Sequence, residues 1–175
     1  MSVVYQARER FKVSKDAPLM AIGVPVRRSA AGCVEFWMSL FQMMPPLNVR
    51  VAYIIQKGML PAAARNEIMK TAIQQGTSYI LFLDDDVLFP DVTALRLWAH
   101  MKVHPEAAAI TGIYTTKFDP TEPLCYAGFG NGAFWDWQFG DLREIHSAGA
   151  GCFMVDVARA AKLKPALDGE AVYCR

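Results

Sequence analysis

Residues 79–86 are Tyr79-Ile80-Leu81-Phe82-Leu83-Asp84-Asp85-Asp86, an apolar run that ends abruptly in three aspartates. A continuous apolar run of this length is typical of a strand that is buried on both faces of a parallel sheet. The three carboxylates then emerge at the carboxyl end of the strand, where open α/β sheets bind their ligands. The segment therefore predicts an α/β fold with a ligand site at the end of this strand.

Three other segments have the composition of buried strands. Residues 18–26 are almost continuously apolar, residues 49–55 combine β-branched and aromatic side chains, and residues 107–114 form another apolar run. Between them lie segments with helical periodicity. The resulting order, β-α-β-α-β-α-β, predicts an α/β sandwich with a mostly parallel sheet.

The predicted helices have recognisable faces and ends. In residues 32–43, four apolar side chains have the spacing of one face of an amphipathic helix: Val34, Trp37, Met38 and Phe41. The next helix has Pro61 at its first position and Gly76 just after its last, with Ala64, Ile68 and Ala72 on one stripe. Asp91 is predicted to cap a third helix that ends near His104.

The C-terminal half departs from this alternation. Residues 128–140 mix glycine and asparagine with aromatic residues, which is typical of a long functional loop or an irregular hairpin. Short strands are expected at residues 142–145 and 152–155. Residues 1–17 are expected to be a polar N-terminal extension, and residues 18–175 one domain that is incomplete at its C-terminus.

Composition limits the possible functions. The 175 residues are 53% hydrophobic and 20% charged, with a formal net charge of +1, so a single domain with a sizeable core is expected. This charge gives no general reason to expect a nucleic acid or a membrane surface as partner. The four cysteines contain no C-x-x-C pair, which argues for buried thiols in a reducing compartment. No signal peptide or transmembrane segment is evident, so the expected location is cytoplasmic.

The aspartate run has the chemistry of a metal site. Adjacent carboxylates repel and raise one another's pKa unless a cation compensates them. Oxygen-only ligands favour a hard cation, Mn²⁺ or Mg²⁺, with phosphate oxygens completing the coordination. Alternation along an extended chain would send Asp84 and Asp86 to one side and Asp85 to the other. The alternative is a solvated acidic turn that only ends the strand.

Several segments together resemble family 2-like glycosyltransferases of the GT-A fold. They are the opening strand Ile22-Gly23-Val24-Pro25-Val26, Ala64-Arg65-Asn66 before the aspartates, the D-x-D motif Asp84-Asp85-Asp86, and the small-residue segment Ala148-Gly149-Ala150-Gly151. The resemblance implies a GT-A-type three-layer sandwich with a mostly parallel, mixed central sheet. It also implies a nucleotide-sugar donor, such as a UDP-sugar, and transfer with inversion.

The resemblance assigns donor-side roles to five residues. Pro25 and Val26 would contact the base or ribose, and Arg65 the nucleotide or its diphosphate. Asp84 would bind the ribose, with Asp85 beside it, and Asp86 would ligate the metal. The alternatives are that Pro25 only ends its strand and that Arg65 lies exposed along its helix with its stem over the sheet.

The acceptor side is expected to include Trp135, Asp136 and Trp137, whose rings could stack on a sugar, together with Gly149, Ala150 and Gly151. His146 is a further possible metal ligand, or else a hydrogen-bonded structural histidine. The acceptor itself is open: a glycan, a protein, a lipid carrier or a modified nucleic-acid base.

The catalytic base is the point where the sequence departs from the family. Inverting members place an aspartate in an acidic pair at the start of a later helix, and the corresponding position here is Ala171. Glu170 or Asp168 is therefore expected to substitute. The alternatives are a catalytically inactive nucleotide-sugar-binding module and a haloacid-dehalogenase-like phosphatase, whose nucleophile motif also follows a buried strand. A sugar nucleotidyltransferase would need a glycine-rich loop after residue 26, which this sequence lacks.

Overall fold

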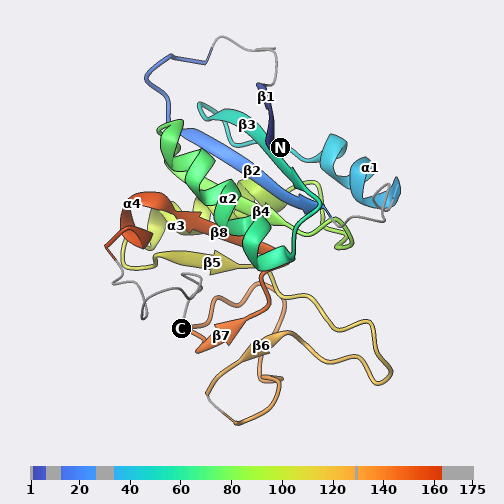
Figure 1. Cartoon of the computed structure of the whole chain (residues 1–175). Helices are drawn as coiled ribbons and strands as arrows, with labels where there is room; N and C mark the ends of the chain where they lie inside the picture. Colours follow the sequence, from blue (N-terminus) through green and yellow to red (C-terminus); the bar gives the residue numbers. More distant parts are fainter. Residues whose placement is uncertain (1, 7–12, 27–33, 129, 163–175) are drawn as a thin grey trace.

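A computed structural model describes residues 2–6, 13–26, 34–128 and 130–162, and its centre is a sheet of six strands (Figure 1). In spatial order they are β1 (Ser2–Gln6), β3 (Arg50–Lys57), β2 (Leu19–Val26), β4 (Tyr79–Leu83), β8 (Cys152–Asp156) and β5 (Ala109–Thr111). β2 pairs in parallel with β3 and β4, whereas β8 is antiparallel to both β4 and β5. β2, β3, β4 and β5 therefore share one direction, which confirms a mostly parallel, mixed sheet.

Helices pack on both faces of the sheet, so the domain has three layers. β4 shows the division, because Ile80 and Phe82 belong to the core on one face and Leu81 and Leu83 to the core on the other. The first face is covered by α2 (Pro61–Gln74), which lies across the sheet in Figure 1. The second is covered by α1 (Val34–Gln42) and α3 (Thr93–Val103), whose buried residues join the larger cluster.

α2 matches its predicted face and ends. Its buried residues are Ala64, Ile68 and Ala72. It begins at Pro61, and Gly76, just after its last turn, has the positive φ of 68° that glycine tolerates. The helix approaches β2 closely, because a Cβ on Gly23 would lie 2.6 Å from Ile68 Cγ2.

Two predictions about the other helices are wrong. The apolar stripe picked out in α1 is largely its exposed face, since Val34, Met38 and Phe41 are exposed and the buried residues are Phe36 and Leu40. Both faces of this helix are apolar, so spacing alone cannot tell which one packs. α3 begins at Thr93 after Val92 and has no side-chain cap, because the turn from Pro90 to Thr93 places Asp91 too far upstream.

Residues 112–151 make a long excursion between β5 and β8. It contains a two-stranded sheet of β6 (Cys125–Tyr126) and β7 (Ser147–Ala148), which lies below the main sheet in Figure 1. The irregular loop predicted at residues 128–140 is confirmed for its described residues. The strand predicted at residues 142–145 is wrong. Three of those four residues are exposed, and pairing begins only at Ser147.

The ends of the described chain add two elements. β1 lies within residues 1–17 and pairs antiparallel along β3, from Ser2 opposite Gln56 to Gln6 opposite Ala52. α4 (Val157–Ala160) directly follows β8 and is capped by Asp156, whose side chain accepts from Arg159 N. Within the described ranges, no helix has the length and apolar character that crossing a bilayer requires. The cytoplasmic location stays a prediction.

Candidate active site

The aspartates and the small-residue segment, residues 148–151, meet at the carboxyl end of β4. β8 enters the sheet where β4 ends, so Cys152 pairs with Leu83. The next residues continue this contact, because Asp84 N donates a 3.0 Å hydrogen bond to Gly151 O. Two segments that are far apart in the sequence are thereby held side by side at the carboxyl end of β4.

Asp84 is paired with Arg65. The guanidinium Nη2 of Arg65, which extends from the first turns of α2, donates to Asp84 Oδ1. Both side chains are largely buried, at 12% exposed for Arg65 and 27% for Asp84. Arg65 Nε is also buried and has no hydrogen-bond partner among the described residues. Arg65 is therefore not the exposed helix residue of the alternative interpretation.

Burial is the main influence on the Asp84 carboxyl. It raises the pKa of Asp84 above its usual value, because desolvation disfavours the charged form. The Arg65 guanidinium opposes this shift through its charge and its hydrogen bond, and the neighbouring Asp86 and Asp85 add smaller increases to the pKa. The repulsion between carboxylates expected from the sequence is present, but it is weaker than desolvation.

The chain turns immediately after Asp84. Val87 N donates to Asp84 O at 3.1 Å, so residues 84–87 form a tight turn and not an extended continuation of β4. The predicted alternation of the three side chains therefore does not apply. Asp85 is buried at the turn, whereas Asp86 is exposed and forms an ion pair with Lys117, its Oδ2 lying 3.0 Å from Lys117 Nζ.

Lys117 reaches Asp86 from an irregular hairpin that follows β5. Leu124 N donates to Tyr114 O at 2.9 Å and Thr116 N donates to Glu122 O at 2.8 Å, which ties the two arms together. Lys117 is the first residue of the tip that these bonds leave free. The sequence analysis did not single it out, and no motif in the sequence marks it.

Tyr114 explains why the neighbouring segment contains glycines. Its hydroxyl accepts a 2.8 Å hydrogen bond from Gly151 N. A Cβ on Gly149 would lie 2.2 Å from the Tyr114 hydroxyl oxygen, and one on Gly151 would lie 2.8 Å from Tyr114 Cζ. The ring therefore occupies the space that side chains at these two positions would fill, and it fixes the segment beside Asp84.

A double-mutant cycle tests this packing. We expect Gly151→Ala to lower the free energy of unfolding by about 1–3 kcal/mol, the usual cost of overpacking. In a Tyr114→Ala background the same change should cost clearly less, because the ring is gone and only the contact with Val87 Cγ2, at 3.0 Å, remains. Urea unfolding of the four proteins measures both values. Equal costs in the two backgrounds would show that Tyr114 is not what requires glycine.

Comparison with known proteins now identifies the chain's family. The family model described as Glycosyl transferase family 2 matches residues 32–137, more than half of the sequence. The chain belongs to glycosyl transferase family 2. The match covers Arg65, the aspartates and Lys117, and it confirms the predicted family and enzyme class. The phosphatase alternative is therefore not retained.

The fold of this glycosyltransferase is similar to the crystal structure of A197 from STIV. The likeness has a TM-score of 0.53 at 16% sequence identity, and it covers 85% of this chain and 69% of A197. At that identity it concerns the fold alone. A comparison with curated proteins gives no significant match.

Pro25 and Val26, which the family resemblance assigns to the donor side, end β2. Both are buried at the carboxyl end of β2, opposite Gln56 and Lys57 of β3. β2 also adjoins β4, so this strand end belongs to the same edge of the sheet as Asp84. Whether Pro25 contacts a base stays a prediction.

The other predicted residues of this glycosyltransferase are spread more widely. Trp135 and Asp136 are exposed on the 128–140 loop. Trp137 is half-buried, packs edge-on against Phe139 at 5.9 Å, and has a buried Nε1 without a described hydrogen-bond partner. His146 is exposed just before β7, where its backbone N donates to Tyr126 O. Glu170 and Asp168 lie outside the described residues.

The described residues contain no preassembled set of metal ligands. Among the described residues, no three His, Cys, Asp or Glu side chains gather into a group that could hold a metal ion. Asp84, Asp86 and His146 therefore do not form a ready-made triad. The carboxylate of Asp86 is nevertheless 45% exposed and made of hard oxygen donors, so it fits a cation that brings other ligands, such as diphosphate oxygens, with it.

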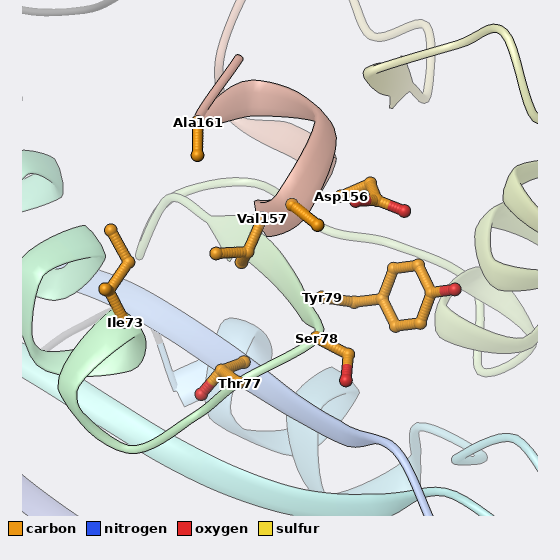
Figure 2. A pocket seen from close by; sticks show the side chains of 8 residues that line it. Ile73, Thr77, Ser78, Tyr79, Asp156, Val157 and Ala161 are labelled. Carbon is orange, nitrogen blue, oxygen red and sulfur yellow. The ribbon is translucent and has the colours of Figure 1, made fainter.

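Two hollows lie near the ends of β4. The larger, of about 440 Å³, is at the amino end, as Figure 2 shows, and is lined there by Ser78, Tyr79 and Val157. Its carboxylate, Asp156, already caps α4. A smaller hollow of about 210 Å³ lies beside the aspartate turn and is lined by Val87, the last residue of that turn, and by Tyr114. Only the smaller one adjoins the carboxyl-end site, because β4 separates the larger one from it by roughly 16 Å of strand.

Proposed function

We propose that this enzyme transfers a sugar from a UDP-sugar to an acceptor hydroxyl, with Mn²⁺ or Mg²⁺ bound through Asp86. The observation that carries the proposal is the arrangement of Arg65, Asp84 and Asp86 at the carboxyl end of β4. A nucleotide diphosphate needs both a hard-cation ligand and fixed polar groups for its ribose. The turn at residues 84–87 offers both, because Asp86 can ligate the cation and Asp84 is a fixed polar group.

Each donor-side residue has a role that fits its environment. Asp84 is held by the Arg65 guanidinium, so its second carboxylate oxygen is positioned to accept from a ribose hydroxyl. Pro25 and Val26 form the apolar wall against which the base would lie. The small-residue segment of Gly149, Ala150 and Gly151, held beside Asp84, would border the donor sugar and the acceptor.

The metal would be held by Asp86 and by the donor's diphosphate oxygens. When bound, it supplies positive charge that stabilises the departing nucleoside diphosphate. Asp86 suits this role because it is the most exposed of the three carboxylates. His146 remains a candidate ligand only by prediction.

The chemical step proposed is direct displacement with inversion. A carboxylate removes the proton from the acceptor hydroxyl as that oxygen attacks the anomeric carbon, and the bond from this carbon to the diphosphate oxygen breaks to release the nucleoside diphosphate. Glu170 or Asp168 is the proposed base. Trp135, Asp136 and Trp137 are proposed to contact the acceptor, which could be a glycan, a protein, a lipid carrier or a modified nucleic-acid base.

A second candidate function is a nucleotide-sugar-binding module without transferase activity. It is favoured by Ala171, which replaces the aspartate that inverting members of the family have at the corresponding position. Slow hydrolysis of UDP-sugars by the purified protein would support a working catalytic centre. Binding of UDP with no hydrolysis or transfer to any acceptor would support the inactive module.

A thermal-shift experiment tests the donor and the metal together. With UDP at about a hundred times its dissociation constant and Mn²⁺ present, we expect the unfolding midpoint to rise by about 5–10 °C, since binding adds roughly 2.7 kcal/mol to the free energy of unfolding. Mn²⁺ alone and UDP with EDTA should give much smaller shifts. An equal UDP shift with Mn²⁺ and with EDTA would contradict a metal-dependent donor site.

A further inference from the structure

The two outer aspartates of the motif are neutralised by cations of very different kinds. Asp84 pairs with Arg65, which belongs to α2 and is only 12% exposed. Asp86 pairs with Lys117, which belongs to the hairpin after β5 and is 68% exposed. Arg65 is packed at the border of the core, whereas Lys117 is held in place mainly by its ion pair with Asp86.

An ion pair as exposed as that of Asp86 and Lys117 is weak. Solvent screens the attraction, and ordering a long lysine side chain costs entropy. Among the described residues, Asp86 is the only bonding partner of the Lys117 ammonium. A divalent cation has twice the charge and reaches the same oxygens directly, so Lys117 is readily exchanged for it.

The position of Lys117 gives the exchange a second consequence. Its backbone lies at the start of the hairpin tip, fixed by the bond from Thr116 N to Glu122 O. An ammonium released from Asp86 therefore stays within reach of the same turn. The donor's diphosphate and the Asp86 carboxylate together carry more negative charge than a divalent metal alone offsets.

We propose that Lys117 is an exchangeable cation of the donor site. It pairs with Asp86 when no metal is bound, yields Asp86 to the metal, and then contacts the diphosphate of the donor. This inference rests on the proposed function, because it takes Asp86 to be the metal ligand. It adds Lys117 as a donor-binding residue on the hairpin. Lys117 would weaken the binding of the metal and strengthen the binding of the nucleotide.

The test begins with Mn²⁺ alone. Calorimetric titration of Lys117→Gln should give an affinity about two- to fivefold tighter than that of the parent, the factor expected from losing a weak competing ion pair. Lys117→Arg keeps the charge and should bind Mn²⁺ like the parent. Lys70→Gln is the matched control, since Lys70 is 67% exposed and pairs with Glu67 at 2.7 Å on the outer side of α2. An affinity of Lys117→Gln that is equal to or weaker than the parent's overturns the inference.

UDP at saturating Mn²⁺ provides the second readout, with the opposite sign. Lys117→Gln should bind UDP about three- to tenfold more weakly than the parent, because a charged hydrogen-bond donor to the diphosphate is lost. Lys117→Arg should restore most of the affinity. A structural role for Lys117 would weaken both ligands together, and unchanged UDP binding in Lys117→Gln also overturns the inference.

The two proposals can fail separately. If the parent binds no Mn²⁺ alone but Lys117→Gln does, the exchange is supported, and the metal-dependent function is contradicted only if UDP binds the parent equally well with Mn²⁺ and with EDTA. If the parent binds Mn²⁺ through Asp86 and Lys117→Gln has the same affinity, the function stands and the exchange is overturned. If neither protein binds Mn²⁺ alone, the exchange is overturned, and the metal-dependent function is decided by whether UDP raises the unfolding midpoint more with Mn²⁺ than with EDTA.

Discussion

Replacing Asp86 by alanine is expected to reduce metal-dependent UDP affinity by about a hundredfold or more, because a direct metal ligand is worth several kcal/mol. The protein should remain folded. The ion pair with Lys117 is exposed and contributes at most about 1 kcal/mol, so the unfolding midpoint without ligand should stay within about 3 °C of the parent's. UDP titration across a series of Mn²⁺ concentrations measures the first effect.

The control for this variant is Asp91→Ala, which removes another exposed carboxylate shortly after the same turn. It should leave UDP affinity unchanged. If Asp86→Ala binds UDP as tightly as the parent, with the same dependence on Mn²⁺, the aspartate run is only the solvated turn at the end of a strand. The family assignment would survive that result, but the donor site would have to lie elsewhere.

Replacing Arg65 by methionine should destabilise the protein by about 2 kcal/mol at pH 7. The change leaves the Asp84 carboxylate without its cation in a largely buried position. Breaking a fully buried pair costs more than this, but the partial exposure of Asp84 allows water to compensate some of the loss. Lys70→Met, which breaks the exposed pair with Glu67, should cost less than about 0.5 kcal/mol.

The pH dependence of this loss has a definite sign. Burial raises the pKa of Asp84 in the folded protein, and removing Arg65 should raise that pKa further. An acid with a raised folded pKa binds more protons when folded, so it lowers stability as pH rises through the folded pKa. The cost of Arg65→Met should therefore shrink at pH 5, and Asp84→Asn should rescue it at pH 7. Urea unfolding at both pH values measures this cost, and an identical cost at pH 5 and pH 7 would contradict this explanation.

Local patterns predicted much of this molecule. The apolar run before Asp84 placed β4 in the core with its carboxylates at a sheet edge. Pro61 and Gly76 marked the limits of α2, and the stripe of Ala64, Ile68 and Ala72 is the face that packs against the sheet. Such features depend on neighbours in sequence, whose propensities and periodicity are visible without coordinates.

Other features depend on segments that are distant in sequence. Lys117 is an exposed lysine like any other until the hairpin brings it to Asp86. Gly149 and Gly151 were assigned to the acceptor side, but the sequence did not show that the ring of Tyr114 leaves no space for side chains at these positions. The buried face of α1 could not be chosen because both of its faces are apolar. In each case the deciding partner lies in another element.

The insertion of β8 between β4 and β5 has a consequence for how the protein folds. β2, β3 and β4 can assemble from contiguous chain, but the edge of β4 remains unpaired until residues 152–156 have been synthesised. β5, although it is made earlier, can join the sheet only through β8. Before β8 can pair with β4 and β5, the two ends of residues 112–151 must come together. The entropy cost of closing this long loop slows the pairing. The aspartate turn meets Gly151 in the same event, so a nascent chain acquires its candidate active site only when β8 joins the sheet.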